Sequence, residues 1–248
     1  MKQILHMAVL FAAILALVGC TPTSQNLAKK AEVTELERVY GDVEGDVVAI
    51  ENPEPIHLDW ATRNIINSYG TIIKRYSRDY GFDWRLTLAI MKAESSFLDS
   101  AVSPMGAEGL MQIMPATQSL VARALDLESV TEPQHNIRAG IYYLSRLYRL
   151  FDSAEENDRI RLTLAAYNAG PGRVFDAQDI ARFLHESPDR WAVIRDALPL
   201  LSSRYSTLHQ HIWENQRPRS GFFANSKETI GYVEKVMDYY DEYRLVLD

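Results

Sequence analysis

The sequence predicts an all-α domain over residues 58–248, and three observations support that fold class. After residue 57, apolar residues recur at three- and four-residue spacing, which is the period of one face of a helix. Residues that start or stop helices stand at the ends of these periodic stretches. No segment alternates apolar and polar residues for long enough to indicate a convincing strand.

The expected helices follow one another with short connections. One face of the first carries Ile65, Ile66, Tyr69, Ile72, Ile73 and Tyr76. Gly81 ends this helix and Asp83 caps the next, whose apolar residues include Leu86, Ile90 and Ala93. Further helices are expected over 117–127, 133–151, 158–168, 175–186 and 189–198. Asn225 with Glu228 resembles a capping box that opens a final helix reaching about Leu247.

Composition narrows the class of protein. A chain of 248 residues suits one full-sized domain, and 47% hydrophobic with 24% charged residues is ordinary for a globular protein. The formal net charge of −7 argues against nucleic-acid binding, which normally needs a basic face. It does not exclude a polyanionic substrate, because a groove can differ in sign from the whole surface.

The N-terminus has the features of a secretory signal. Lys2 precedes an uncharged run from Met7 to Gly19, which is short for a membrane span of about 20 residues. The run ends in Leu17-Val18-Gly19-Cys20, which resembles the bacterial lipobox, and Cys20 is the only cysteine. We therefore expect a lipoprotein signal peptide over 1–19, a lipid on Cys20 and attachment to a membrane. An ordinary signal peptide with a chance cysteine is the alternative.

Residues 20–57 are expected to form a flexible tether between the lipid and the domain. Polar and acidic residues are scattered through this segment, Pro53 and Pro55 close it, and a short helix fits residues 28–40. The same composition is typical of a plain disordered N-terminus. Thr21, rather than Asp, follows the cysteine, and by analogy with Gram-negative lipoprotein sorting this favours a periplasm-facing location on the outer membrane.

Glu94 lies near the end of the helix that Asp83 is expected to cap. Met91, Phe97 and Leu98 surround it in sequence, and glycines follow at 106 and 109. A glutamate on a helix is usually a solvated surface residue. Glu94 by itself therefore indicates no function, and its neighbours must be considered.

Several short segments together resemble the signature of soluble lytic transglycosylase domains, whose fold is lysozyme-like. They are Glu94-Ser95-Ser96-Phe97, Ser103 with Gly106-Ala107, GLMQIMP at 109–115, AYNAG at 166–170, and Glu228-Thr229 followed by Tyr232-Val233. Their order over roughly 140 residues is more specific than any single motif. The resemblance covers residues 58–248.

Four other segments are similar to the catalytic half of the membrane-bound lytic murein transglycosylase F family. They are residues 82–86, 198–201 and 221–223, and Tyr239-Tyr240. That family carries a large N-terminal domain similar to solute-binding proteins. Here we expect only the tether before the catalytic domain, so no regulation by such a domain is carried over.

The resemblance implies a peptidoglycan lytic transglycosylase, with Glu94 as its catalytic residue and no cofactor. Such enzymes cleave the β-1,4 bond between N-acetylmuramic acid and N-acetylglucosamine and leave 1,6-anhydromuramic acid ends. One glutamate acts first as acid and then as base, so apolar neighbours are expected to raise the pKa of Glu94. Carried over by position in the motifs, the substrate-binding residues are Ser103, Met111, Gln112, Met114, Tyr167, Asn168, Glu228 and Tyr232.

Other interpretations stay open at this point. A lysozyme-like hydrolase would need a second carboxylate, for which Asp83, Asp99 and Glu108 are the candidates. A non-catalytic lipoprotein that only binds peptidoglycan would need no catalytic carboxylate. For Glu228, a structural role at the start of the last helix explains the residue as well as glycan binding does. His209 and His211 have no accompanying ligand cluster, so we expect no metal site.

Overall fold

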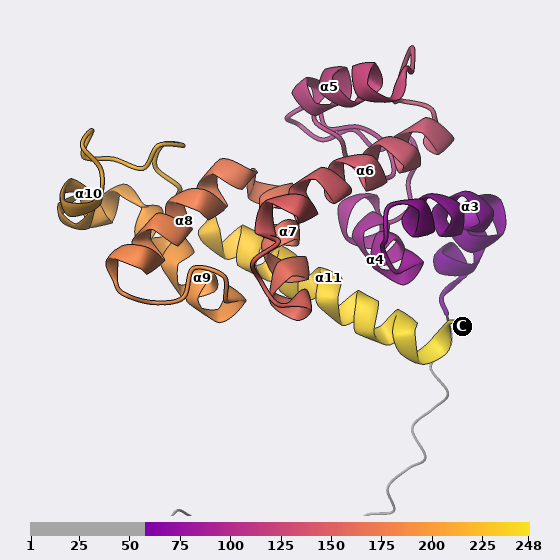
Figure 1. The fold of residues 1–248 in the computed structure, drawn as a ribbon. Coiled ribbons are helices and arrows are strands. Elements are labelled where there is room, and N and C mark those ends of the chain that lie inside the picture. The colour runs from indigo at the N-terminus through magenta and orange to yellow at the C-terminus, as the bar shows by residue number, and fades with distance from the viewer. Residues whose placement is uncertain (1–57) are drawn as a thin grey trace, which may run out of the picture. The chain divides into compact units, whose positions relative to one another are not determined.

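The computed structural model describes residues 58–248, and all regular elements in that range are helices (Figure 1). The α-helices are α3 (Trp60–Asp79), α4 (Trp84–Ser95), α5 (Pro115–Leu125), α6 (Pro133–Tyr148), α7 (Glu156–Ala169), α8 (Pro171–Phe183), α9 (Trp191–Ala197), α10 (Ser206–Ile212) and α11 (Ser226–Val246). Short 3-10 helices are η2 (Arg149–Phe151), η3 (Leu198–Leu201) and η4 (Ser203–Tyr205). The described β-pairing is limited to isolated bridges of Glu108 with Val102 and Ile113. The all-α prediction is confirmed.

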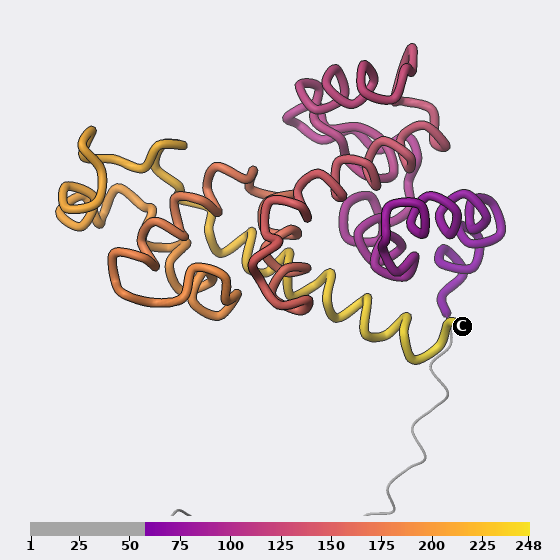
Figure 2. Tube along the Cα trace, viewed as in Figure 1, coloured from indigo at the N-terminus to yellow at the C-terminus, as the bar shows by residue number. Residues whose placement is uncertain are grey.

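Helix α11 joins the two ends of the domain. Figures 1 and 2 show it running from the side of α8 and α9 to the side of α3 and α4, where the chain ends. It packs against α4 and α7 on its way, while α6 packs against α3, α5 and α7. A residue early in α11 can therefore contact α4 although the two helices are far apart in sequence.

Aspartates cap the first two helices, and the second of these caps is the one that the sequence predicts. Asp59 caps α3 by accepting from the Thr62 backbone N–H at 2.7 Å. Asp83 caps α4 by accepting from the Arg85 backbone N–H at 3.0 Å. Each carboxylate satisfies an N–H that has no partner inside the helix, which stabilises a helix end by about 1 kcal/mol.

One predicted helix start is wrong, and at a second helix the start at Asn225 is as predicted but the predicted capping box is absent. Helix α8 begins at Pro171 rather than near residue 175, because Gly170 at φ 88° ends α7 and a proline suits the first helical position. The capping box at Asn225 is absent, since its side chain accepts no hydrogen bond from the first turn of α11. Asn225 Nδ2 instead donates weakly to Glu228 Oε2 at 3.4 Å. Helix α10 was not predicted at all.

The core fills the space between α4, α6 and α7 and extends under the segment between α4 and α5. Leu88, Met91, Ile141 and Leu162 are completely buried there, and so is Leu110 from that segment. Burial of a large aliphatic side chain contributes about 1.5–3 kcal/mol. This core fixes the end of α4 and the segment that follows it.

The expected signal peptide, lipidated Cys20, tether and short helix at 28–40 lie outside the described residues. Within residues 58–248, none of the helices combines the length and apolar character required to span a membrane.

Candidate active site

Glu94 lies in the last turn of α4 and is half-buried. The Tyr232 hydroxyl of α11 donates a hydrogen bond to Glu94 Oε1 at 2.7 Å. The neighbouring Ser95 Oγ donates to the carbonyls of Met91 and Leu110 at 3.1 and 3.0 Å, which fastens the end of α4 to the segment after it. The packing of α4 on α11 thus places a carboxyl and a phenol in direct contact.

Burial raises the pKa of Glu94 from its ordinary value of 4.5 to about 7. The desolvation of the carboxylate is the largest cause, and it outweighs the hydrogen bond from Tyr232 and the charge of Lys235, which both lower the pKa. A carboxylic acid with this pKa exists in both protonation states near neutral pH. It can therefore donate a proton in one step and accept one in the next.

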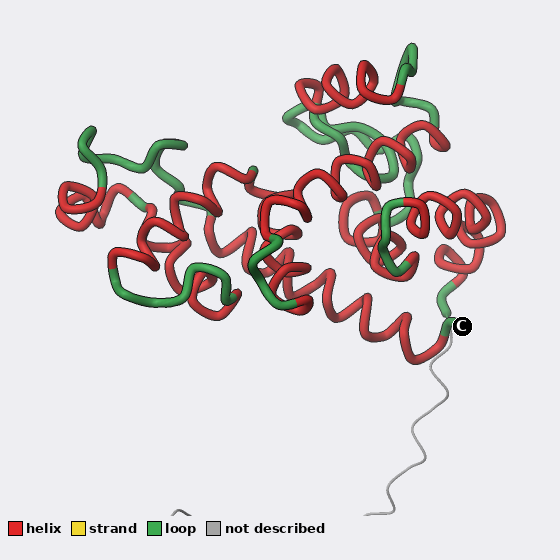
Figure 3. Tube along the Cα trace, viewed as in Figure 1, coloured by secondary structure: helices red, strands yellow, loops and turns green. Residues whose placement is uncertain are grey.

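The chain leaves α4 through two strained residues. Ser96 and Phe97 adopt left-handed backbone conformations, at φ 50° and 66°, which non-glycine residues rarely adopt. They turn the chain into the motif loop, as we call residues 96–114 between α4 and α5, which Figure 3 shows without regular structure. The strain lies immediately beside Glu94, where it is held by the hydrogen bonds of Ser95.

Polar side chains of the motif loop close it on itself. Ser103 Oγ accepts from the Ala107 N–H at 2.9 Å, and the Ser103 N–H donates to the Ala107 carbonyl at 2.8 Å. Gln112 Nε2 donates to the carbonyls of Ala101 and Gly109, both at 3.0 Å. Ser103 and Gln112 therefore shape the loop, while their predicted contacts with glycan stay predictions.

Asn136 of α6 supports the motif loop, and the sequence analysis did not single it out. Its side chain is completely buried, and its Oδ1 accepts from the Met111 N–H at 2.8 Å. Its Nδ2 donates to the carbonyls of Glu108 and Val130 at 3.0 and 3.1 Å. One amide thus satisfies three buried backbone groups. The sequence did contain a signal for Asn136: it is a polar residue next to Ile137, on the buried side of a predicted helix.

Tyr167 connects the motif loop to α7. Its hydroxyl donates to the Met111 carbonyl at 2.8 Å, and its ring packs on Tyr143 with centroids 5.6 Å apart. Burial and the nearby Glu94 carboxylate raise its pKa well above the ordinary range, so the phenol stays protonated. The Met111 side chain is completely buried against Gly140, where an added Cβ would lie 2.6 Å from Met111 atoms. That side chain presents no surface to a ligand; only its carbonyl takes part in the site.

The remaining predicted site residues are exposed. Met114 is 42% exposed at the start of α5, and Glu228 is exposed on α11. Asn168 is exposed, and its Oδ1 accepts from Thr229 Oγ1 of α11 at 2.8 Å. Asn168 and Thr229 therefore join α7 and α11 one helical turn before Tyr232.

The three candidates for a second carboxylate make other contacts. Asp83 is paired with Arg85 at 2.8 Å and also accepts from Tyr240. Asp99 is exposed, and Glu108 accepts from Gln118 Nε2 at 3.3 Å. Among residues 58–248, the charge that contributes to the shifted pKa of Glu94 is that of Lys235.

The histidine pair is divided between two environments. His209 is buried and its Nε2 lies 2.7 Å from the Leu200 carbonyl, while His211 is exposed. No group of three or more potential metal ligands occurs among residues 58–248.

Comparison with known proteins defines the class of this domain. Residues 71–188 match the transglycosylase SLT domain family. The fold is similar to that of the 70 kDa soluble lytic transglycosylase from Escherichia coli, with a TM-score of 0.50 and 27% identity over 71% of this chain and 24% of that one. An inactive mutant of lytic transglycosylase Slt from Pseudomonas aeruginosa gives a TM-score of 0.51 and 25% identity over 75% and 27% of the two chains. Residues 71–188 therefore resemble a transglycosylase SLT domain, and the lysozyme-like fold prediction is confirmed.

More specific relatives are membrane-bound lytic murein transglycosylases F. The protein of Desulfosudis oleivorans is 33% identical over 171 residues, which cover 68% of this chain and 35% of the relative. That of Alcanivorax borkumensis is 32% identical over 213 residues, which cover 83% and 40%. The predicted similarity to this family is confirmed. The chain spans well under half the length of these relatives.

Proposed function

We propose that this protein is a peptidoglycan lytic transglycosylase in which Glu94 is the only catalytic carboxylate. The observation that carries the proposal is the pKa of about 7 that burial gives Glu94 beside the Tyr232 hydroxyl. The match of residues 71–188 to the SLT domain and the names of the relatives support the substrate and the reaction class. The Pseudomonas structure is of a mutant described as inactive with Gln in place of a Glu, which agrees with a single essential glutamate in that relative.

In the first step, protonated Glu94 donates its proton to the glycosidic oxygen between N-acetylmuramic acid and N-acetylglucosamine. The bond from that oxygen to C1 of the muramic acid breaks, and the glucosamine leaves with the proton. Positive charge develops at C1, where the oxygen of the substrate's own N-acetyl group stabilises it. Glu94 is left ionised, and the hydrogen bond from Tyr232 and the charge of Lys235 stabilise that form.

In the second step, ionised Glu94 accepts the proton of the C6 hydroxyl of the same muramic acid. The C6 oxygen then attacks C1 and closes the 1,6-anhydro ring. Glu94 ends the cycle protonated, and no water is consumed. A pKa close to the working pH allows the residue to perform both transfers.

The neighbouring residues have two roles in this proposal. Asn168 and Met114 are exposed, and in this proposal they contact glycan directly. Tyr167 positions the motif loop through the Met111 carbonyl and presents its ring to the saccharide. Ser103 and Gln112 keep the loop in the shape that the glycan meets.

We further propose that the enzyme acts from a membrane as a lipoprotein. The lipobox at residues 17–20 carries this part of the proposal, and Thr21 favours the outer membrane. The relatives are named membrane-bound, which agrees with an envelope location. Metabolic labelling with a radioactive fatty acid would test it: the label should be incorporated by the wild-type chain and not by Cys20→Ala.

The catalytic proposal is tested with purified sacculi and the full chain in detergent. The released muropeptides, measured by mass spectrometry, should be one water lighter than those of a lysozyme digest. Glu94→Gln should release none, because the amide cannot donate the proton. Glu234→Gln, the same change at an exposed position of α11, should leave the products unchanged.

Two outcomes would contradict the proposal. Products of normal mass would mean that water attacks C1, as in a hydrolase with a second carboxylate. Binding to sacculi without any product from the wild-type chain would indicate a peptidoglycan-binding protein.

A further inference from the structure

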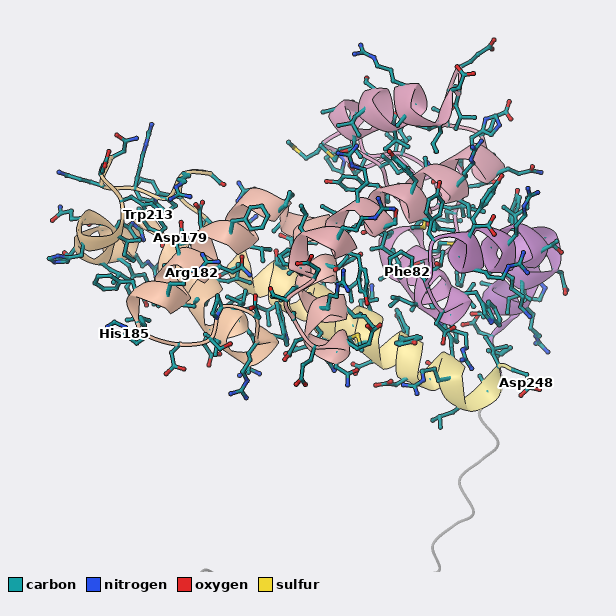
Figure 4. The ribbon with its side chains drawn as sticks, in the orientation of Figure 1. Phe82, Asp179, Arg182, His185, Trp213 and Asp248 are labelled. Atoms are coloured by element: carbon teal, nitrogen blue, oxygen red, sulfur yellow. The ribbon has the colours of Figure 1, made fainter. Side chains whose placement is uncertain are left out.

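The segment between α10 and α11, residues 213–225, contains a polar hollow that the catalytic proposal does not use. We call this segment the arginine loop. The hollow has a volume of about 450 Å³, and its lining includes Trp213, Glu214, Arg217 and Arg219. Figure 4 shows Trp213 beside Asp179 and Arg182 at the end of the domain that carries α10. A hollow of this size accommodates a short segment of peptide or a few small groups.

A buried carboxylate fixes the backbone of the arginine loop. Asp176 of α8 is 2% exposed, and its two oxygens accept from the N–H groups of Arg219 and Ser220 at 3.1 and 2.8 Å. Ser220 lies so close to Gly172 that a Cβ there would overlap its Oγ. Contacts with α8 therefore fix the backbone position of Arg219, in addition to contacts within the arginine loop.

The arginines of this region are exposed, while Asp176 is buried and Asp179 is partly buried. Asp179 is partly buried and receives Arg182 at 3.0 Å, Arg219 at 3.4 Å and the Trp213 indole N–H at 3.3 Å. The Arg219 side chain is nevertheless 74% exposed, and Arg217 is exposed as well. Glu214 is the one exposed carboxylate that lines the hollow. Two guanidinium groups thus have donors free for an external acceptor.

The arginine loop is connected to the candidate active site through α8, on which it packs, and through α11, into which it leads. Ser220 packs on the first turn of α8, which begins directly after the Ala166–Gly170 motif. Phe223 then lies under the guanidinium of Arg173, 4.8 Å from its ring centroid. The loop leads into α11, whose early residues reach Asn168 and Glu94. The chain therefore runs from the arginine loop directly into the helix that contacts Asn168 and Glu94.

We propose that Arg217 and Arg219 bind carboxylates of the peptide stems that the glycan strand carries. This rests on the proposed function, which supplies a substrate with an acidic peptide on its muramic acid residues. A guanidinium binds a carboxylate through two parallel hydrogen bonds, and its planar donors suit this ligand better than an ammonium group does. The hollow provides the space for the peptide, and Asp176 holds the site in place.

The test compares two glycan probes for binding to the full chain in detergent. One probe is a set of purified glycan fragments with intact peptide stems, and the other is the same set after an amidase has removed the stems. The Glu94→Gln substitution is present in every protein, so that neither probe is consumed. Arg217→Gln with Arg219→Gln should weaken binding of the stem-bearing probe about fivefold, because each exposed ion pair contributes modestly. Binding of the stripped probe should not change.

A matched control carries Arg63→Gln with Arg78→Gln, two exposed positions on α3, and removes the same charge. It should leave both affinities unchanged, and thermal unfolding should show that both double variants remain folded. Equal weakening for both probes, or none for either, would overturn the proposal. Loss of binding to anionic phospholipid vesicles with unchanged binding of the stem-bearing probe would also overturn it, in favour of a lipid phosphate. Because binding does not require turnover, a wild-type chain that cleaves nothing would refute the proposed function without deciding this one.

Discussion

Two segments without regular structure, the motif loop and the arginine loop, are both held by one buried polar side chain, but by different chemistry. Asn136 uses both ends of its amide, so it accepts from Met111 and donates to two carbonyls. The Asp176 carboxylate can only accept hydrogen bonds, and it accepts one from each of two consecutive backbone N–H groups. Each anchor lies on a neighbouring helix rather than in the loop itself.

The difference shows what each loop requires. The motif loop contacts Asn136 with both N–H and C=O groups, so only a side chain with both donors and an acceptor satisfies it. The arginine loop needs only an acceptor at its contact point with α8. The motif loop, which places groups beside the half-buried Glu94, is fixed at more points than the arginine loop, which presents cations to solvent.

Asn136→Ala should have the largest effect on stability. The Met111 N–H and the Val130 carbonyl would lose their partner, while the Glu108 carbonyl keeps the Ile113 N–H, so the free energy of unfolding should fall by about 3 kcal/mol. Urea denaturation would measure the loss, and Asn64→Ala, at an exposed position of α3, is the control. A loss no larger than that of the control would mean that water or another side chain replaces the amide.

Asp176→Ala should be less damaging and should act on one region. Two N–H groups would lose a charged acceptor, which should lower the free energy of unfolding by about 2 kcal/mol. Hydrogen exchange at Arg219 and Ser220 should become faster, while exchange in the motif loop should not. The exposed Asp238→Ala is the matched change, and faster exchange throughout the domain would show that Asp176 does more than anchor the arginine loop.

Glu94→Gln should stabilise the protein at alkaline pH and not at acid pH. The pKa in the folded state, about 7, lies above the ordinary 4.5, so the folded state binds the proton more tightly. Stability due to Glu94 is complete below pH 4.5 and is lost as the pH rises through 7. Because the glutamine needs no desolvation of charge, its gain at pH 8 should be on the order of 2 kcal/mol. Equal stability of the two proteins from pH 4 to pH 8 would contradict the raised pKa.

Tyr232→Phe should give the smallest effect, a shift of the pH profile. The phenol lowers the pKa of Glu94 by stabilising its ionised form, so its removal should raise that pKa further. The alkaline limb of kcat/KM should move upward by less than about one pH unit, the value of one hydrogen bond. Tyr239→Phe, two turns along α11, should leave the limb in place. A downward shift would mean that the phenol favours the acid form.

Much of the fold was predictable because local signals suffice for it. The apolar spacing from Ile65 to Tyr76 and the cap at Asp83 predict α3 and α4 without knowledge of any contact. Helix α10 was missed because its seven residues are too few to establish a period. The start of α8 was missed, although Gly170 ends α7 and the proline that follows suits a first helical turn.

The candidate site was predictable as a set of residues and not as an arrangement. The order of the motifs assigned Glu94, Tyr167 and Tyr232, but it gave Met111 a contact with substrate that its buried side chain does not offer. Asn136 and Asp176 carry no motif, since a buried amide or carboxylate is recognised by its partners and these come from distant parts of the chain.

The sequence by itself determined the helical class, most of the helix positions and the choice of Glu94 as the candidate acid, because periodicity, caps and motif order are properties of the chain. The tertiary structure alone decided the state of that acid. Packing of α4 against α11 removes water from Glu94 and brings Tyr232 within 2.7 Å, over a separation of 138 residues. Desolvation depends on what surrounds a group in space, and for that reason only the folded chain raises the pKa of Glu94 to about 7.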